Sequence, residues 1–161
     1  MPETLVAEPI RLTYADFRAL PEDGRRYEIL DGELHVSPSP GEQHQRVVGR
    51  LFSTLMHYVE LAGHGVVYVA PFDVVLSDGS VVEPDIVYVS NARRHIITEE
   101  NIQGVPDLLI EVLSPNRPEV DSRSKRNLYA RHGVPFYWMV DPSQRELTEL
   151  QLFGNAYAVV S

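Results

Sequence analysis

The chain has 161 residues, of which 43% are hydrophobic, and this is enough for a folded domain spanning residues 1–161 and argues against wholesale disorder. It contains no cysteine, which excludes disulfides, thiolate metal sites and cysteine nucleophiles, and it has no apolar run near the roughly 20 residues of a membrane span. The formal net charge of -9 argues against a nucleic-acid binder that relies on overall positive charge, but not against an enzyme whose metal ions meet a phosphate.

The start of the chain contains acids and prolines but lacks the apolar stretch of a secretory signal peptide. Because cysteine is also absent, we expect a cytoplasmic protein in a reducing compartment. The first predicted elements are a short helix at 13–20 and a β-hairpin at 25–36, in which Asp31-Gly32 forms a two-residue turn.

A long amphipathic helix is expected at about 41–62, because apolar residues recur at helical spacing from Val48 onward. Ser39 and Glu42 lie three residues apart and fit a capping box, and Pro40 suits the first helical position. The sequence therefore predicts a helix that begins beside a proline-rich loop.

The remaining chain predicts strands separated by one further helix. Segments rich in β-branched and aromatic residues lie at 66–70, 72–76, 81–89 (interrupted by Pro84), 107–113, 136–140, 147–153 and 157–160. The nearly continuous apolar runs at 107–113 and 136–140 are typical of strands covered on both faces, and a helix at 121–132, capped by Asp121 or Ser122, separates them. We therefore expect an α/β fold, a mixed β-sheet flanked by helices with core order αβββαβ over about 41–142 and an N-terminal β-hairpin.

Glu111 is the first residue that breaks this hydrophobic pattern. It lies among large aliphatic residues in the strand at 107–113, where a carboxylate is costly unless it is paired or binds a metal. The alternative is an edge strand that places Glu111 in water.

Lys125 is the second such residue and the only lysine among 14 basic residues. At 100° per residue it shares the apolar face of its helix with Leu128 and Tyr129, while Arg123, Arg126 and Arg131 point elsewhere. A snorkelling lysine at the margin of this face is the alternative. A general preference for arginine would explain why lysine is rare, but not why this lysine faces inward.

Three further titratable residues are candidates for the same site. Asp85 follows Pro84 and alternates onto one strand face with Val87, although an ordinary aspartate at a strand start is the simpler interpretation. His44 faces inward from the first turn of the long helix, where a polar histidine at a helix end is equally reasonable. Glu28 could approach that helix end from the hairpin, unless it lies on a solvated hairpin face.

Two carboxylates on neighbouring strands and one inward lysine would together form a candidate active site. Two acids held close together at low dielectric either share a proton or bind a divalent cation. Oxygen ligands favour Mg²⁺ or Mn²⁺, which would acidify an attacking water and neutralise charge on a phosphate. The lysine would orient or deprotonate that water, or stabilise the oxyanion.

Pro84-Asp85 and Glu111 resemble the acidic motif of the PD-(D/E)XK nuclease superfamily. The usual lysine position of that motif holds Leu113, but some branches carry the lysine on the following helix, as Lys125 does here. More specifically, the chain resembles the Uma-type restriction endonuclease family over nearly its whole length, although family members usually carry more residues at the C-terminal end. The stretches that carry the resemblance are Tyr27-Glu28, Asp31-Gly32-Glu33-Leu34, His44-Gln45-Arg46, Pro84-Asp85, Pro106-Asp107-Leu108, Glu111-Val112-Leu113-Ser114-Pro115, Lys125-Arg126, Tyr129, Gly133-Val134, Tyr137-Trp138 and Val140-Asp141-Pro142.

The resemblance implies a restriction-endonuclease-like fold. It implies that Asp85 and Glu111 hold Mg²⁺ (or Mn²⁺) together with the carbonyl of Val112, and that Lys125 is the catalytic lysine. Supporting positions of the site are Glu28, His44 and Tyr129, all of which lie in the matching stretches.

The leading hypothesis is therefore a Mg²⁺-dependent endonuclease that hydrolyses DNA phosphodiester bonds by metal-activated water, and a homodimer would suit cleavage of both strands. The alternative is a catalytically silent module of the same fold that acts in protein assembly or DNA binding, as the net charge of -9 suggests. A hydrolase of small phosphate compounds is a third option, without a phosphate-cradling glycine loop to support it. The one dense basic cluster that could contact DNA is formed by Arg117, Arg123, Lys125, Arg126 and Arg131, and Arg46 and Arg50 would have to join it.

Overall fold

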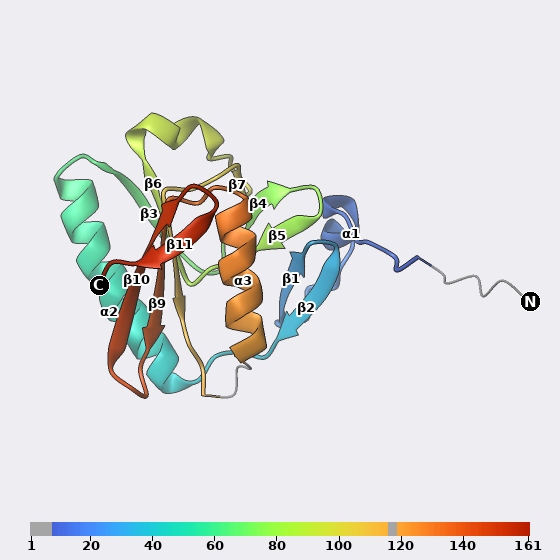
Figure 1. Ribbon diagram of the computed structural model, residues 1–161, viewed down its shortest axis with the longest axis horizontal. Coiled ribbons are helices and arrows are strands. Elements are labelled where there is room, and N and C mark those ends of the chain that lie inside the picture. Colours follow the sequence, from blue (N-terminus) through green and yellow to red (C-terminus); the bar gives the residue numbers. More distant parts are fainter. Residues whose placement is uncertain (1–7, 116–118) are drawn as a thin grey trace, which may run out of the picture.

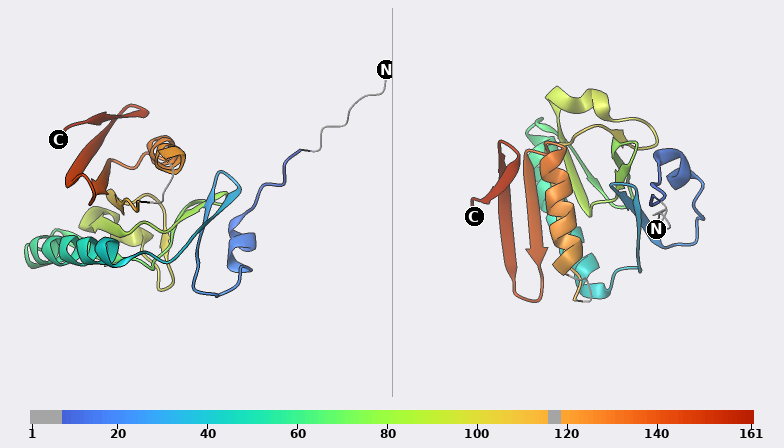
Figure 2. Two further views of the ribbon diagram at one scale, coloured as in Figure 1. Left: turned by 90° about the horizontal axis from the view of Figure 1, so that it is seen from below. Right: turned by 45° about the vertical axis from the view of Figure 1, so that its right-hand side comes forward.

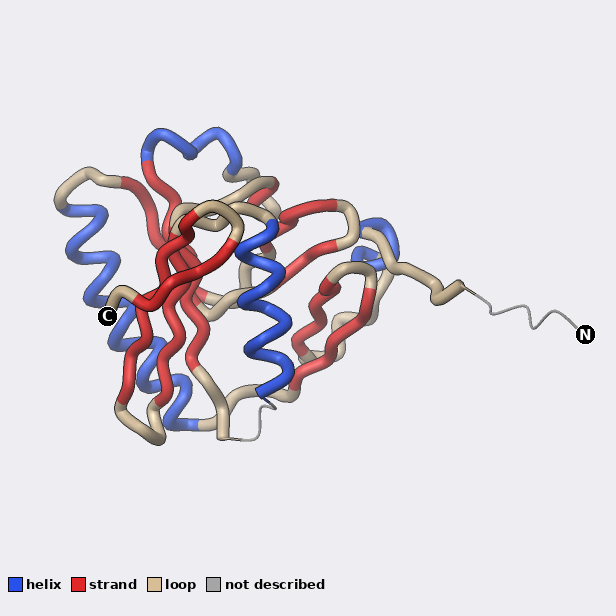
Figure 3. The backbone as a smooth tube through the Cα atoms, in the orientation of Figure 1, coloured by secondary structure: helices blue, strands red, loops and turns tan. Residues whose placement is uncertain are grey.

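The computed structural model describes residues 8–115 and 119–161, with the backbone alone at 119–121. Its helices are α1 (Tyr14–Arg18), α2 (Glu42–Leu61), the 3-10 helix η1 (Asn91–Ile96) and α3 (Glu119–Arg131). Its strands are β1 (Arg26–Leu30), β2 (Glu33–Ser37), β3 (Gly65–Val69), β4 (Val74–Ser77), β5 (Ser80–Val82), β6 (Ile86–Ser90), β7 (Ile102–Gln103), β8 (Leu108–Val112), β9 (Phe136–Asp141), β10 (Glu146–Phe153) and β11 (Ala156–Val159). Figures 1 and 3 show a central sheet between α2 and α3, with the β1–β2 hairpin beside it. None of the described helices has both the length and the apolar character needed to cross a membrane.

The central sheet has six strands in the order β11-β10-β9-β8-β6-β3. Strand β8 pairs in parallel with β9 and antiparallel with β6. Side chains alternate between the two faces, so that Ile110 packs with Val48 of α2 and Leu109 packs with Leu128 of α3. The two helices therefore cover opposite faces, as the left panel of Figure 2 shows. Taken in chain order, α2, β3, β6, β8, α3 and β9 give the predicted αβββαβ core, and the α/β fold class is confirmed.

A second sheet of five strands, in the order β2-β1-β5-β4-β7, stands beside the first. The sequence predicted a strand at 81–89 interrupted by Pro84, and the interruption is confirmed. The two parts, β5 and β6, belong to different sheets, which the sequence did not predict. Pro84 lies at the break, where a residue without an N–H cannot contribute to a ladder of hydrogen bonds. The break places Asp85 at the junction of the two sheets.

The N-terminal hairpin forms as expected. Asp31 and Gly32 both have positive φ, 51° and 83°, as a tight two-residue hairpin turn requires. A Cβ on Gly32 would lie 2.8 Å from the side chain of Arg11, so that only glycine fits here. The register sets Glu28, in the middle of β1, opposite His35, and Glu28 is buried.

Both long helices begin at residues other than those predicted. The N-cap of α2 is Gly41, which has an extended backbone and makes no side-chain capping bond. Ser39 is therefore two residues short of the helix, and the predicted capping box is wrong. Helix α3 begins at Glu119, so Ser122 lies inside the helix and does not cap it, and the side chain of Asp121 lies outside the described residues.

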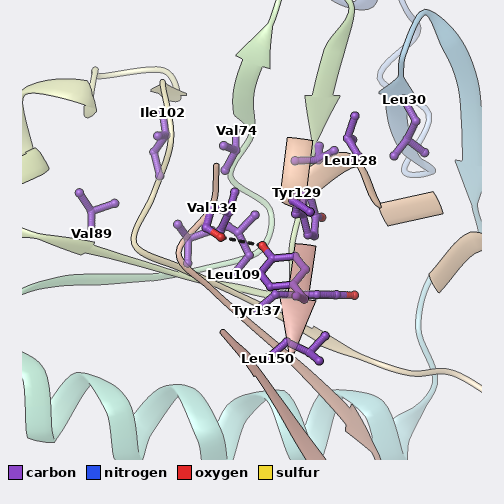
Figure 4. Packing of buried hydrophobic residues seen from close by; sticks show 14 residues of the cluster. Leu30, Val74, Val89, Ile102, Leu109, Leu128, Tyr129, Val134, Tyr137 and Leu150 are labelled. Carbon is purple, nitrogen blue, oxygen red and sulfur yellow. Dashed lines mark hydrogen bonds between the residues drawn. The ribbon is translucent and has the colours of Figure 1, made fainter. Parts of the chain in front are cut away.

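The larger hydrophobic core lies between the central sheet and α3. Figure 4 shows Tyr129 of α3, Tyr137 of β9 and Leu150 of β10 in this cluster, all fully buried. The rings of Tyr129 and Tyr137 meet edge to face with their centroids 5.0 Å apart, a favourable aromatic geometry. This packing fixes α3 over the sheet and so fixes the position of Lys125 one turn earlier.

Candidate active site

Asp85 and Glu111 lie side by side at one end of the central sheet. The antiparallel register of β6 and β8 pairs Ile86 with Ile110, and one further step along both strands brings the two acids together. Their side chains are 0% and 1% exposed. Since Ile86 and Ile110 face α2, Asp85 and Glu111 face the other side of the sheet, toward α3 and the hairpin.

Glu111 is held by two donors from α3. The Nζ atom of Lys125 lies 2.9 Å from its Oε1 atom, and the hydroxyl of Tyr129 donates to the same oxygen at 2.9 Å. The alternative of an edge strand in water is wrong, because β8 lies between β6 and β9 and all five of its residues are buried. Burial and the neighbouring charge of Glu111 raise the pKa of Tyr129 well above its ordinary value, so that its hydroxyl remains a donor.

Lys125 joins Glu111 to the hairpin. Its Nζ atom lies 2.8 Å from Oε1 of Glu28, and the lysine side chain is 1% exposed, so the snorkelling alternative is wrong. Glu28 also accepts a bond from the main-chain N–H of Glu83 at 2.9 Å. With an exposed fraction of 1%, Glu28 does not lie on a solvated hairpin face.

Asp85 accepts hydrogen bonds on both of its oxygens. Its Oδ2 atom lies 2.7 Å from the N–H of Val112 and 3.1 Å from Nε2 of His44, while its Oδ1 atom lies 3.0 Å from Nη1 of Arg26. Burial acts to raise the pKa of the Asp85 carboxyl, but the His44 bond, the Arg26 charge and the Val112 N–H outweigh it and lower the pKa to about 2. Asp85 is therefore an ionised, buried carboxylate.

His44 reaches Asp85 from the first turn of α2, around the end of the sheet. The contact uses Nε2, which leaves Nδ1 as the second nitrogen of the ring. That Nδ1 atom is buried and has no hydrogen-bond partner in the described part of the chain. His44 is therefore more than a polar residue at a helix end, because its ring contacts the central carboxylate of the cluster.

Arg26 belongs to this cluster, although the sequence did not identify it as a candidate site residue. Its Nε atom lies 2.7 Å from Oε1 of Glu83 while its Nη1 atom bonds to Asp85, and its side chain is 14% exposed. Burial lowers the pKa of Arg26, but the surrounding carboxylates, Asp85 first, raise it by more. Arg26 lies two residues before Glu28 in a predicted strand and so shares its face, but an arginine at the start of a strand is ordinary and gives no separate signal.

The donor chemistry of the cluster fits a hard divalent cation. Four carboxylates lie around two cations, Arg26 and Lys125; they are those of Glu28, Glu83, Asp85 and Glu111. When Glu83 is ionised, this set of six side chains carries two more negative charges than positive ones. Among the side chains of residues 8–115 and 122–161, no three from His, Asp or Glu converge on one point as a complete cage. Mg²⁺ does not require such a cage, because it commonly uses one or two carboxylates together with water and substrate phosphate.

Two cavities lead from solvent to this cluster. One, of about 310 Å³, is lined by Arg26, His44, the loop 37–43 and Leu113. The other, of about 560 Å³, is lined by Arg26, Glu83 and Asp85 among others. Arg26 lines both cavities, whereas Asp85 and Glu83 line only the larger one.

The predicted basic cluster is only partly formed around this site. Helices α2 and α3 lie on opposite faces of the central sheet, so Arg46 and Arg50 do not join the arginines of α3, and Arg46 pairs with Glu42. On α3, Arg131 pairs with Asp31 of the hairpin turn. Arg117 lies outside the described residues.

The chain was compared with known proteins. A solved structure described as a putative nuclease belonging to DUF820 from Anabaena variabilis ATCC 29413 superposes with a TM-score of 0.77 at 20% sequence identity, covering 92% of this chain and 83% of that one. At this identity the likeness shows the fold, which is therefore restriction-endonuclease-like, as expected. No curated protein matches the chain. The model of the Uma2 family, described as "Putative restriction endonuclease", matches residues 14–161, and the chain belongs to that family.

Proposed function

We propose that this chain is a Mg²⁺-dependent endonuclease, with Mn²⁺ as a possible substitute, that hydrolyses phosphodiester bonds of DNA. The observation that carries the proposal is the pair of fully buried carboxylates, Asp85 and Glu111, on adjacent strands with the single lysine of the chain bonded to one of them. A buried carboxylate pair is costly unless a cation balances it. Membership of a family described as restriction endonucleases supports the same reaction.

Each side chain of the site has a role in this proposal. Asp85 and Glu111 would hold the metal with the carbonyl of Val112, and the bound ion supplies an acidified water and neutralises phosphate charge. Lys125 holds a proton and a positive charge beside Glu111, where it can orient the attacking water or stabilise the oxyanion.

The other polar residues are positioning groups. Tyr129 and Glu28 fix Glu111 and Lys125, each through a bond of 2.8 to 2.9 Å. His44 fixes the orientation of Asp85 through its Oδ2 atom. These contacts hold the reacting groups in place before substrate arrives. Such preorganisation supplies a large part of the rate enhancement of an active site.

Several broader features belong to the same proposal. The whole chain would act as one domain in the cytoplasm, and a homodimer would allow both strands of a duplex to be cut. Because the net charge is -9, affinity for DNA would come from the metal and from local arginines rather than from the overall field.

The test is cleavage of plasmid DNA with Mg²⁺ or Mn²⁺ by the wild type and by Glu111→Gln and Asp85→Asn. We expect both variants to lose at least about 100-fold in rate, since each removes a charged metal ligand. The matched control is Glu146→Gln, the same chemical change at an exposed position of β10. Circular dichroism establishes that each variant is folded at the assay temperature. Equal cleavage by all four proteins would refute the proposal.

One observation favours the second candidate, a catalytically silent module of this fold. Asp85 and Glu111 already pair with Arg26 and Lys125, and a chain that had lost its metal would need such internal cations. Calorimetric titration with Mn²⁺ separates the two candidates. Binding that disappears in Asp85→Asn supports the enzyme, and an absence of binding in the wild type supports the module.

A further inference from the structure

Arg26 has no role in the proposed reaction, yet it is the charged residue that contacts Asp85 from the solvent side. Its guanidinium bridges two carboxylates, with Nε bonded to Glu83 and Nη1 bonded to Asp85. Glu83 and Asp85 flank Pro84 at the junction of the two sheets, so the bridge spans the place where the chain passes from one sheet to the other.

The two oxygens of Asp85 differ in what holds them. Oδ2 is bonded to the main-chain N–H of Val112 and to the ring of His44, and both donors belong to rigid elements, β8 and α2. Oδ1 is bonded to Arg26, the end of a long side chain. Oδ1 is therefore the oxygen whose partner can be exchanged without moving a strand or a helix.

The surroundings of Arg26 allow that exchange. Glu83 holds the guanidinium through a separate nitrogen at 2.7 Å, so Arg26 can leave Asp85 and remain bonded to Glu83. Two cavities, of about 310 and 560 Å³, adjoin Arg26 and give its guanidinium room to turn, and the larger one, which Asp85 also lines, gives an ion a route to Oδ1. Two cations cannot share one carboxylate oxygen cheaply, because their repulsion at a few ångströms is large at low dielectric.

We propose that Arg26 is a positioning residue that occupies the cation's place on Oδ1 of Asp85 and yields it when a divalent ion binds. The inference rests on the proposed function, since it takes Asp85 to be a metal ligand. The released guanidinium, still bonded to Glu83, then faces the cavities by which a substrate phosphate would enter. A bidentate arginine is well suited to bind such a phosphate. Arg26 thus keeps the Asp85 carboxylate oriented before the ion arrives.

The first experiment measures the accessibility of Arg26 in the wild-type protein, so that no variant has to fold. Phenylglyoxal modifies exposed guanidinium groups, and peptide mass mapping gives a rate for each arginine with and without Mn²⁺. Arg26, with a side chain 14% exposed, should react slowly without the ion and several-fold faster with saturating Mn²⁺. Arg18 and Arg131, 55% and 54% exposed, serve as internal standards whose rates should not change.

The second experiment measures Mn²⁺ affinity by calorimetry in the wild type and in Arg26→Met. Removing the competing cation should tighten binding roughly tenfold, the equivalent of one charge-assisted hydrogen bond. The matched control is Arg131→Met, the same change at a residue that is 54% exposed and pairs with Asp31 of the hairpin turn; it should leave the affinity unchanged.

The outcomes separate this inference from the proposed function. Faster labelling of Arg26 in the presence of Mn²⁺ supports the exchange. If Mn²⁺ binds to the wild type but the labelling rate of Arg26 stays constant, the exchange is overturned and the metal site stands. If the wild type binds no Mn²⁺, the proposed function and the exchange both fall.

Discussion

The charged cluster has two halves that differ in their relation to solvent. The closed half consists of Glu28, Glu111, Lys125 and Tyr129, and none of these side chains is more than 2% exposed. The open half consists of Arg26, His44, Glu83 and Asp85, and each of these residues lines at least one of two cavities. In the closed half the side-chain contacts join α3, β8 and β1, with one further bond from the main-chain N–H of Glu83. In the open half, Glu83 and Asp85 are both bonded to the long side chain of Arg26.

This difference assigns separate physical tasks to the two halves. A charge buried without a partner is strongly destabilising, so removing any charged side chain of the closed half should lower the stability of the protein strongly. In the open half, water or an ion can replace a lost partner, and the cost of a change is smaller. The closed half should therefore govern stability, and the open half should govern what binds. Four predictions test this division, from the largest expected effect to the smallest.

Lys125→Met should have the largest effect on stability. It leaves Glu28 and Glu111 buried without the cation that bridges them, and we expect a loss of about 3–5 kcal/mol in the free energy of unfolding. Urea denaturation in the presence of a chelator measures this. Arg131→Met, which removes a cation that is 54% exposed, is the control and should cost less than about 1 kcal/mol. Equal losses in the two variants would contradict the prediction that the closed half governs stability.

The pH dependence of stability should report Asp85 in the open half. The folded-state pKa of this carboxyl is about 2, below the ordinary value of 3.8, so the carboxyl stabilises the fold above the ordinary value, and this contribution is lost as the pH falls toward 2. The difference corresponds to about 2 kcal/mol. Urea denaturation of the metal-free wild type and of Asp85→Asn, at pH 6 and across this acid range, measures it. If the two proteins show the same dependence on pH, Asp85 is not the group responsible.

Tyr129→Phe isolates a single hydrogen bond of the closed half. The phenyl ring can keep its edge contact with Tyr137, so the change removes chiefly the bond to the Glu111 carboxylate. A bond to a charged group should cost about 1.5–2 kcal/mol when lost. The control is Tyr157→Phe, which removes a bond to the neutral carbonyl of Val134 and should cost about 1 kcal/mol. Thermal unfolding of the two variants side by side gives the comparison, and a smaller loss for Tyr129→Phe would contradict the charged character of Glu111.

The sequence predicted the closed half better than the open half, for a physical reason. Glu111 and Lys125 break apolar patterns of a strand and a helix, and such a violation is visible in a single chain. Arg26 breaks no pattern, because an arginine at the start of a strand is ordinary. Its importance comes from the pairing of β1 with β5 and from the change of sheet at Pro84, which are long-range features that local periodicity does not encode.

The same limit explains the mistaken cap of α2. Ser39 and Glu42 have the spacing of a capping box, but spacing does not specify where an extended loop ends, and here the backbone remains extended through Gly41. The real capping box of this chain joins Thr13 to Asp16 at the start of α1. Local motifs of this kind therefore identify candidate helix ends, and tertiary contacts select among them.

Ser39→Ala should have the smallest effect of the four changes. Ser39 lines both cavities of the open half, and it makes no capping bond to α2, so its removal should change the free energy of unfolding by less than about 0.5 kcal/mol. Thr13→Ala is the matched control, because it removes the hydroxyl of a formed capping box and should cost about 1 kcal/mol. Urea denaturation of the two variants measures both values. A loss above about 1 kcal/mol for Ser39→Ala would mean that a residue lining the cavities contributes to the stability of the fold. That result would contradict the division between a stabilising half and a binding half.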